Sequence, residues 1–129
     1  MESIEEKKAW EEVKQKSRFH HAFRGWRIFL SPTRNLPIHV SAAFLVLALG
    51  LYFRVSSAEL ILLIFAIGLV LISEAFNSAI EIDIDLTSPQ YHPYARDTKD
   101  VAAGAVLLAV LTAVIVGLVI FLPKIINVI

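Results

Sequence analysis

The sequence predicts an all-α membrane protein in which an N-terminal amphipathic surface helix precedes three membrane-spanning helices. Of the 129 residues, 57% are hydrophobic, which is too apolar a composition for an ordinary soluble domain. Three apolar stretches stand out, at residues 38–53, 60–80 and 101–122. A helix needs roughly 20 residues to cross a bilayer, and fewer where its flanking side chains reach the interface. Three such helices fill most of the chain, so we expect a single domain over residues 1–129.

Basic residues are distributed unevenly around these stretches, although the formal net charge is zero. Of the twelve Lys and Arg, eight precede the first stretch, two lie between the second and third, and Arg54 and Lys124 are the remainder. Positively charged segments stay on the cytoplasmic side of a membrane. We therefore expect the N-terminus and the second loop in the cytoplasm and the C-terminus outside. The chain has no cysteine, which excludes a disulfide framework and a thiolate metal site.

The N-terminal segment, residues 3–29, is predicted to form one amphipathic helix. Its large apolar residues recur near helical spacing, with basic residues between them: Trp10, Val13, Phe19, Phe23 and Trp26. Such a helix lies in the membrane interface with its aromatic side towards the lipid. A polybasic surface anchor without any further role is the alternative. Pro32 and Pro37 then interrupt the helix before the first span.

The first span is predicted over residues 38–53 and the second over residues 60–86. Ser56 and Glu59 stand before the second span in the S-x-x-E spacing of a capping box. No loop signal separates the apolar part of this span from the acidic residues that follow it. We therefore expect one helix that continues beyond the membrane on the cytoplasmic side.

The third span is predicted over residues 98–122. It follows a loop that contains Pro89 and Pro93, and we expect Asp97 to cap the helix. Small residues at the start of this span, at positions 102–105, permit close approach of a neighbouring helix.

Four acid or amide side chains lie at the end of the second apolar stretch and just beyond it: Glu74, Asn77, Glu81 and Asp85. At 100° per residue, Glu81 and Asp85 lie roughly 20° to either side of Glu74, and Asn77 lies about 60° away. Ionisable groups at a membrane are costly and mark a functional site by default. Clustered carboxylates can bind a hard cation or act as a general base. Transfer of a phosphoryl group from Mg-ATP to a hydroxyl needs both roles.

Lys99 and Asp100, at the start of the third span, could supply a cation for phosphate oxygens and an acceptor for a nucleotide. Helix capping and membrane anchoring are the structural alternatives for this pair. The sequence has neither a G-x-x-x-x-G-K-[ST] loop nor a protein-kinase signature, so a nucleotide site would be non-standard.

The run E-A-F-N-S-A-I-E-I-D-I-D at residues 74–85 resembles the signature of the small prokaryotic diacylglycerol kinases, E-x-x-N-[ST]-[SA]-[IV]-E-x-x-x-D. The undecaprenol kinases of Gram-positive bacteria share this signature. The resemblance extends to F-H-H-A-F-R-G-W at residues 19–26, to N-x-x-I-H at residues 35–39 and to A-R-D-T-K-D-V-A-A-G-A-V-L-L at residues 95–108. It covers roughly residues 17–122.

The resemblance implies a homotrimeric lipid kinase in the bacterial cytoplasmic membrane, with composite active sites between subunits. Such an enzyme transfers the γ-phosphate of ATP to undecaprenol or diacylglycerol, in phospholipid or cell-envelope lipid-carrier metabolism. The expected cofactor is Mg²⁺. The expected partners are ATP, the lipid alcohol, the bilayer and further copies of the chain, with no nucleic acid. The N-x-x-I-H element favours a polyprenol over diacylglycerol.

The resemblance also implies roles for individual residues. Glu74 matches the general base, Glu81 matches a ligand of the divalent cation, and Asn77 and Asp85 order the site. Contacts with ATP are implied for Lys14, His21, Asn77, Glu81, Asp85, Tyr91, His92, Lys99 and Asp100. The candidates for contact with the lipid are Glu74, Asn35 and Ala103.

Two positions depart from the family pattern. Thr33 stands where the family usually has a second metal-binding glutamate, and His21 stands where a tyrosine is common. A hydroxyl can coordinate Mg²⁺ but brings no negative charge. A non-catalytic or metal-impaired relative that binds nucleotide or lipid is therefore the main alternative. A proton or ion pathway is a weaker alternative, because the third span and the upper half of the second carry almost no polar groups.

Overall fold

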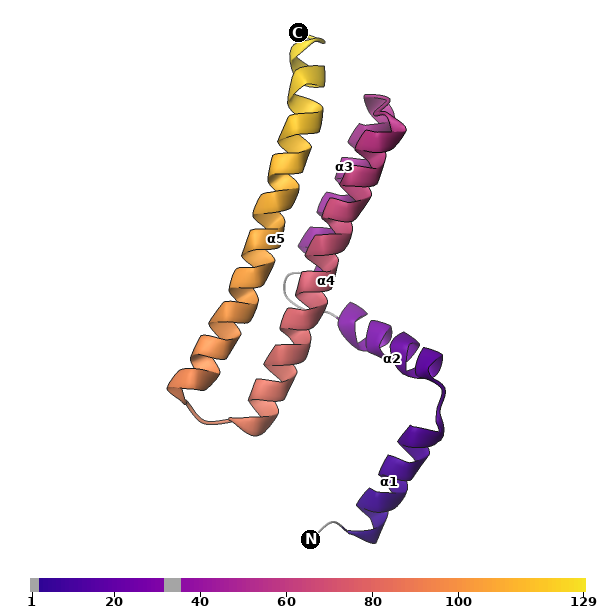
Figure 1. The fold of residues 1–129 in the computed structure, drawn as a ribbon, viewed down its shortest axis with the longest axis vertical. Coiled ribbons are helices and arrows are strands. Elements are labelled where there is room, and N and C mark those ends of the chain that lie inside the picture. The colour runs from indigo at the N-terminus through magenta and orange to yellow at the C-terminus, as the bar shows by residue number, and fades with distance from the viewer. Residues whose placement is uncertain (1–2, 32–35) are drawn as a thin grey trace. The chain divides into compact units, whose positions relative to one another are not determined.

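The computed structural model describes residues 3–31 and 36–129, and the regular structure in these ranges is entirely helical, as predicted. Five helices follow one another along the chain (Figure 1): α1 (Ile4–Gln15), α2 (Arg18–Leu30), α3 (Leu36–Tyr52), α4 (Ser57–Thr87) and α5 (Pro93–Ile126). They belong to two compact units. The first, Met1–Thr33, contains α1 and α2, and the second, Arg34–Ile129, contains α3, α4 and α5.

In the first unit, the prediction of one continuous surface helix over residues 3–29 is wrong. The chain is extended at Lys16 and Ser17, and two separate helices result. The Ser17 hydroxyl accepts a hydrogen bond from the backbone N–H of His20 at 3.3 Å, so that Ser17 begins a new helix as its N-cap. His21 Nε2 lies 2.9 Å from the carbonyl oxygen of Val13 in the last turn of α1, which also accepts from the backbone N–H of Lys16 at 3.3 Å. The apolar residues keep their helical spacing across the break, so the sequence pattern alone does not reveal that the helix ends there.

An aromatic face remains uncovered on α2. Phe19, Phe23 and Trp26 are 79%, 71% and 69% exposed. Large apolar side chains gathered on one helix usually meet another apolar surface. The placement of this segment in a membrane interface stays a prediction.

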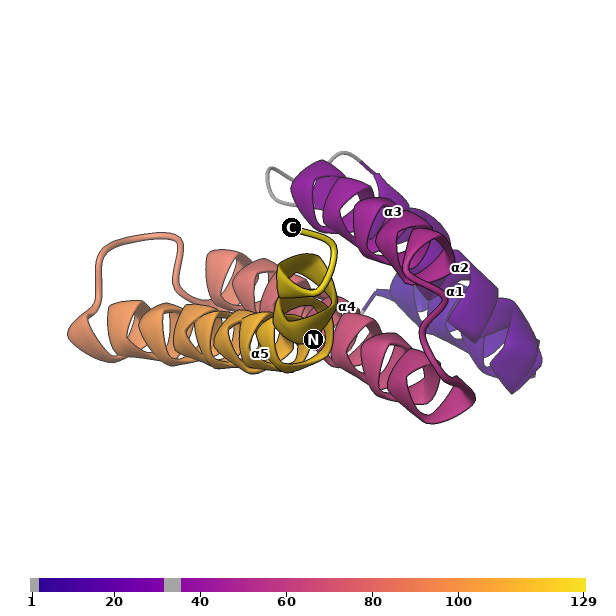
Figure 2. The same cartoon turned by 90° about the horizontal axis from the view of Figure 1, so that it is seen from above.

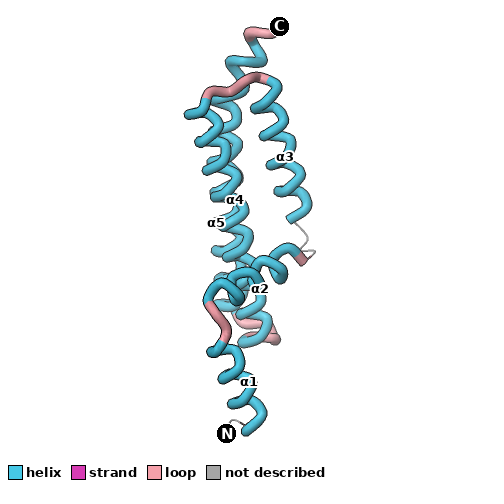
Figure 3. The backbone as a smooth tube through the Cα atoms, turned by 90° about the vertical axis from the view of Figure 1, so that its right-hand side faces the viewer, coloured by secondary structure: helices cyan, strands magenta, loops and turns pink. Residues whose placement is uncertain are grey.

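In the second unit, α4 and α5 lie side by side and antiparallel (Figures 1 and 2), and α3 packs against α4. Figure 3 shows that only short loops join the three helices at their ends. The buried core contains Leu63 from α4 and Ile120 and Phe121 from α5. Phe53, after the last turn of α3, packs on Phe121 with the ring centroids 6.1 Å apart. This core lies at the end of the unit where α3 connects to α4.

An ion pair joins α4 to α5 at the same end of the unit. Lys124 Nζ on α5 lies 3.0 Å from Glu59 Oε1 on α4, and both side chains are about three-quarters buried. Glu59 also completes the predicted capping box. Its Oε2 accepts from the backbone N–H of Ser56 at 2.7 Å, and its own N–H donates to Ser56 Oγ at 3.2 Å. The capping prediction for α4 is therefore confirmed.

The start of α5 differs from the prediction. The helix begins at Pro93 rather than at residue 98, and its N-cap is His92, whose Nδ1 accepts from the N–H of Tyr94 at 3.3 Å. Proline is favourable in the first turn of a helix because the N–H that it lacks would have no partner there. Asp97 consequently lies inside the helix, where its carboxylate accepts hydrogen bonds from Arg96, and it is not the cap that we predicted.

Among the described residues, α4 and α5 are long and apolar enough to cross a membrane, whereas α3 is a shorter apolar helix of 17 residues. At 1.5 Å per residue, α3 is about 26 Å long, slightly less than the roughly 30 Å of a bilayer core. That α3 spans the membrane therefore stays a prediction, which requires the side chains flanking the helix to extend to the membrane interface.

The turn between α3 and α4 places Arg54 in the left-handed region, with φ of 51°. This conformation costs a side chain with a Cβ about 1–2 kcal/mol, and it costs glycine almost nothing. We expect Arg54→Gly to raise the free energy of unfolding by about 0.5–1 kcal/mol, because the greater entropy of the unfolded glycine chain offsets part of the gain. Unfolding in detergent, followed by circular dichroism, measures the effect. Arg54→Ala removes the charge but keeps the strain, and an equal gain there would show that strain is not the cause.

Candidate functional site

The acidic face of α4 has the arrangement that its periodicity predicts, because the helix continues without a break to Thr87. Burial differs along this face. Glu74 and Asn77 are only 5% and 9% exposed, whereas Glu81 and Asp85 are open. The face therefore passes from buried polar groups near the middle of the helix to accessible carboxylates at its end.

Glu74 is held by a residue from another helix. His39, in the first turns of α3, places its Nε2 2.7 Å from Glu74 Oε1. The two side chains are 18% and 6% exposed, so the contact is largely shielded from solvent. A buried polar group needs a partner, and an acid at membrane depth especially so. The pair joins α3 to α4 at the position of the predicted general base.

Asn77 and Glu81 form a second contact one turn further along α4. Asn77 Nδ2 donates to Glu81 Oε1 at 3.3 Å. Within the described chain, Asn77 Oδ1 is buried without a hydrogen-bond partner. Buried polar atoms are rarely left unpaired, and each exception requires an explanation such as a bound ion or water. An amide oxygen beside a carboxylate is a donor pair that suits Mg²⁺.

The metal donors available from one chain are few. In residues 3–31 and 36–129, no three His, Cys, Asp or Glu side chains gather in a group that could hold a metal ion. Mg²⁺ commonly takes one or two protein carboxylates and completes its shell with water and substrate phosphates. Glu81 with the free oxygen of Asn77 fits that limited requirement.

A charged cavity lies where α4 turns into α5. Its volume is about 280 Å³, and five of the residues predicted to contact ATP line it: Asp85, Tyr91, His92, Lys99 and Asp100. Lys99 Nζ is paired with the carboxylate of Asp85, which connects the ends of the two helices. Arg96 also lines the cavity, and its Nη1 donates to the hydroxyl of Tyr91 at 3.5 Å. The cavity brings cations, carboxylates and an aromatic ring together.

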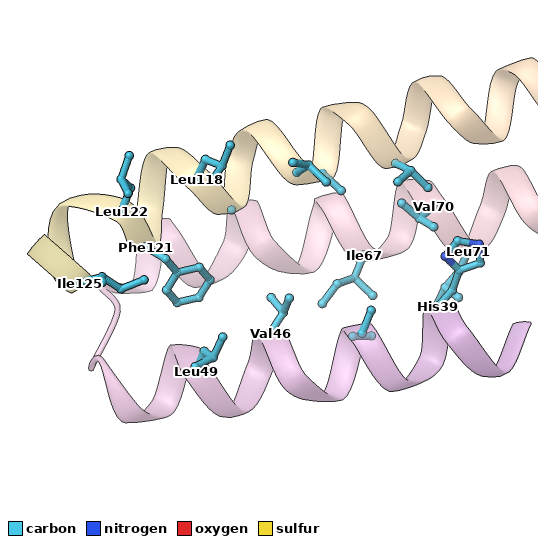
Figure 4. Close-up of a pocket in the computed structure, with 16 residues that line it drawn as sticks. His39, Val46, Leu49, Ile67, Val70, Leu71, Leu118, Phe121, Leu122 and Ile125 are labelled. Carbon is cyan, nitrogen blue, oxygen red and sulfur yellow. The ribbon is translucent and has the colours of Figure 1, made fainter. Parts of the chain in front are cut away.

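An apolar groove runs between α3, α4 and α5 in the same unit (Figure 4). It has a volume of about 360 Å³, and in the described structure its lining is apolar except for His39 at one end. Val70 and Leu71, one turn before Glu74, line the wall near this histidine. A hydrocarbon chain in the groove would thus meet its first polar group beside Glu74.

Of the remaining predicted residues, Ala103 does not line these cavities, and the others belong to the first unit or lie outside the described residues. Lys14 is exposed on α1, and His21 bonds to Val13, both in the first unit. Ala103 is exposed on α5. Thr33 and Asn35 lie outside the described residues. Their assignments stay predictions.

Two residues of the site were missed or underrated from the sequence. The sequence analysis includes His39 only as the last residue of the N-x-x-I-H element, although a histidine that enters an apolar stretch needs a polar partner at the same depth. That need does not identify Glu74 as the partner, because the pairing depends on how α3 packs against α4. Arg96 carried no comparable signal, because one arginine beside a loop is usually a solvated surface group.

Comparisons with known proteins identify the family of the chain. The sequence profile of the family described as prokaryotic diacylglycerol kinase matches residues 20–121. The undecaprenol kinase of Bacillus subtilis is 40% identical over 106 residues, which cover 82% of this chain and 86% of that protein. Diacylglycerol kinases of Synechocystis and Escherichia coli K12 are each 36% identical, over 84% and 57% of this chain and 63% and 61% of their own lengths.

A helical protein with apolar helices, a buried acid on one of them and a charged cavity at the end of the same helix has the features of a membrane lipid kinase. The chain belongs to the prokaryotic diacylglycerol kinase family. The names of its relatives indicate lipid kinase activity and do not favour the non-catalytic alternative.

Proposed function

We propose that the protein transfers the γ-phosphate of Mg-ATP to a membrane lipid alcohol, with undecaprenol preferred over diacylglycerol. The observation that carries the proposal is the position of Glu74. This buried carboxylate is hydrogen-bonded to His39, which lines one end of the apolar groove. A lipid can keep its tail in the groove while its hydroxyl reaches the carboxylate.

Glu74 acts as the general base in this proposal. Its carboxylate takes the proton from the lipid hydroxyl as the hydroxyl oxygen bonds to the γ-phosphorus. The bond from that phosphorus to the bridging oxygen of ADP breaks, so the products are a phosphorylated lipid and ADP. Phosphoryl transfer depends mainly on positioning and charge neutralisation. A fixed carboxylate and nearby cations are therefore the groups that the reaction needs.

The charged cavity at the α4–α5 turn is the proposed nucleotide site. Lys99 and Arg96 supply cations for phosphate oxygens, while Asp100 and Tyr91 offer polar and aromatic contacts to the remainder of ATP. Lys14 and His21 stay predicted contributors from the first unit.

Mg²⁺, when bound, would neutralise negative charge on the phosphates. Glu81 and Asn77 Oδ1 are the groups that would hold it, with Asp85 nearby. Thr33 would add a neutral oxygen where a carboxylate is usual. We therefore expect a weaker metal site than that of relatives with two glutamates.

We further propose that the protein is a homotrimer in the bacterial cytoplasmic membrane. The N-terminus and the α4–α5 loop would face the cytoplasm, as the distribution of basic residues indicates. The trimer is supported by the family resemblance, and it would complete a site for which one chain provides few metal donors.

The preference for a polyprenol is supported by the N-x-x-I-H element and by the undecaprenol kinase relative from Bacillus subtilis. The groove itself suits either tail, because its walls carry only Ala, Val, Leu, Ile, Gly and Phe beyond His39. An assay on purified lipids must therefore decide the acceptor.

The test is a transfer assay with radiolabelled ATP and the purified protein in nanodiscs, offered undecaprenol, shorter polyprenols and diacylglycerol in turn. We expect labelled undecaprenyl phosphate as the main product, loss of activity in EDTA and recovery with Mg²⁺. Faster labelling of diacylglycerol would reverse the substrate preference. No labelled lipid, together with measurable ATP binding, would support the non-catalytic alternative, and activity created by Thr33→Glu would identify the missing carboxylate as the cause.

A further inference from the structure

We infer that His39 is a positioning residue for Glu74, fixing the carboxylate so that its second oxygen receives the proton of the lipid hydroxyl. This inference rests on the proposed function. It assigns to α3 a part in the reaction that the acidic signature on α4 does not contain.

The contact itself has a specific geometry. When Glu74 is ionised, both of its oxygens can only accept, so the 2.7 Å contact means that His39 Nε2–H donates to Oε1. The terminal torsion of a glutamate is broad, and the carboxylate of an unrestrained side chain rotates readily. One hydrogen bond from a separate helix removes that freedom and leaves Oε2 for the substrate.

Burial gives the contact its importance. Glu74 is 5% exposed, so water cannot easily replace the histidine as donor. An ionised carboxylate in apolar surroundings is costly unless it is hydrogen-bonded. The ionised form is also the form that accepts a proton. His39 therefore supplies the hydrogen bond that the buried carboxylate needs and fixes its orientation.

The groove places the substrate at the same point. His39 is the polar end of the apolar groove in the described structure, and Figure 4 shows it at one end of the groove. A lipid alcohol whose tail fills the groove presents its hydroxyl to the His39–Glu74 pair. His39 acts through Glu74, and it is not itself the proton acceptor.

The test compares His39→Leu, which removes the donor, with His39→Gln, whose amide can still donate to Glu74. We expect His39→Leu to lower kcat 10- to 100-fold, with KM for ATP changed less than twofold, and His39→Gln to keep at least a third of the parent kcat. Ser41→Ala, on the same helix, is the matched control and should leave the activity unchanged. Equal losses in His39→Leu and His39→Gln would overturn the inference.

A double mutant separates this inference from the proposed function. If His39 acts through Glu74, adding His39→Leu to Glu74→Gln should reduce kcat by less than a further twofold. Full activity in Glu74→Gln would refute the proposed base and the inference with it. A large loss in Glu74→Gln with parent-like activity in His39→Leu would refute only the inference.

A spectroscopic measurement keeps the inference testable if His39→Leu does not fold. In protein labelled with ¹⁵N-histidine, the spectrum of His39→Gln identifies the His39 signals by their loss. We expect Glu74→Leu to shift the His39 Nε2 signal and to leave the signals of His20 and His92 in place. An unmoved His39 signal would overturn the inference.

Discussion

Glu74→Gln should lower the kcat for lipid phosphorylation by roughly 10²–10⁴-fold, the range that a positioned general base contributes. Glutamine has nearly the same shape and can still accept the hydrogen bond from His39, so the fold should persist. It cannot accept the proton of the lipid hydroxyl. The assay measures initial rates at saturating ATP and lipid, so that the loss appears in kcat rather than in binding.

The matched control for this change is Asp83→Asn. Asp83 is an exposed acid on the same helix, roughly opposite Glu74 at 100° per residue. Its loss removes the same charge from α4 without touching the site, and it should leave the rate within twofold. If Asp83→Asn reduced the rate as much as Glu74→Gln, the effect would be one of general charge and not of a base.

Lys99→Met should reduce kcat/KM for ATP by about 10²-fold, because one charged donor to the transferring phosphate is lost. Lys99 lines the charged cavity and lies near the start of α5, at the end of the helix that is predicted to face the cytoplasm. Lys99→Arg keeps the charge and should retain a measurable part of the activity. KM for the lipid should change little in either variant.

Asp85→Asn tests whether Lys99 contributes through contact with ATP or through its ion pair, which holds α4 and α5 together at this cavity. The Asp85–Lys99 pair connects α4 to α5, so Lys99→Met could also act by loosening this end of the unit. If that were the cause, Asp85→Asn should produce the same loss and the same fall in thermal stability. We expect instead a smaller loss in Asp85→Asn, since Lys99 stays available for the phosphates.

Local pattern predicted the acidic face of α4 well, and tertiary contacts limited the rest. Glu74, Asn77, Glu81 and Asp85 share a face because α4 is one regular helix, and helical periodicity is sufficient to place them. The His39–Glu74 contact joins residues 35 positions apart, and it depends on how α3 packs against α4. A single sequence does not contain that packing.

The helix ends show where two local signals compete. At Ser17 the capping hydroxyl outweighed a continuous amphipathic pattern, and the predicted single helix became two. At Pro93 the residue taken for a helix breaker is instead the first residue of α5. In both cases the position of the residue relative to the helix end decides its effect, and periodicity alone does not give that position.

The ion pair between Glu59 and Lys124 lies at one end of the three-helix unit, next to the core residues Leu63, Ile120 and Phe121. Asp85 and the charged cavity lie at the opposite end. The ion pair and the charged cavity are thereby separated along the length of the unit. The apolar groove, in contrast, extends from His39 to Phe121 of the core cluster. Substitutions in the charged cavity can therefore leave the distant core intact, whereas substitutions that reshape the groove also alter the packing around Phe121.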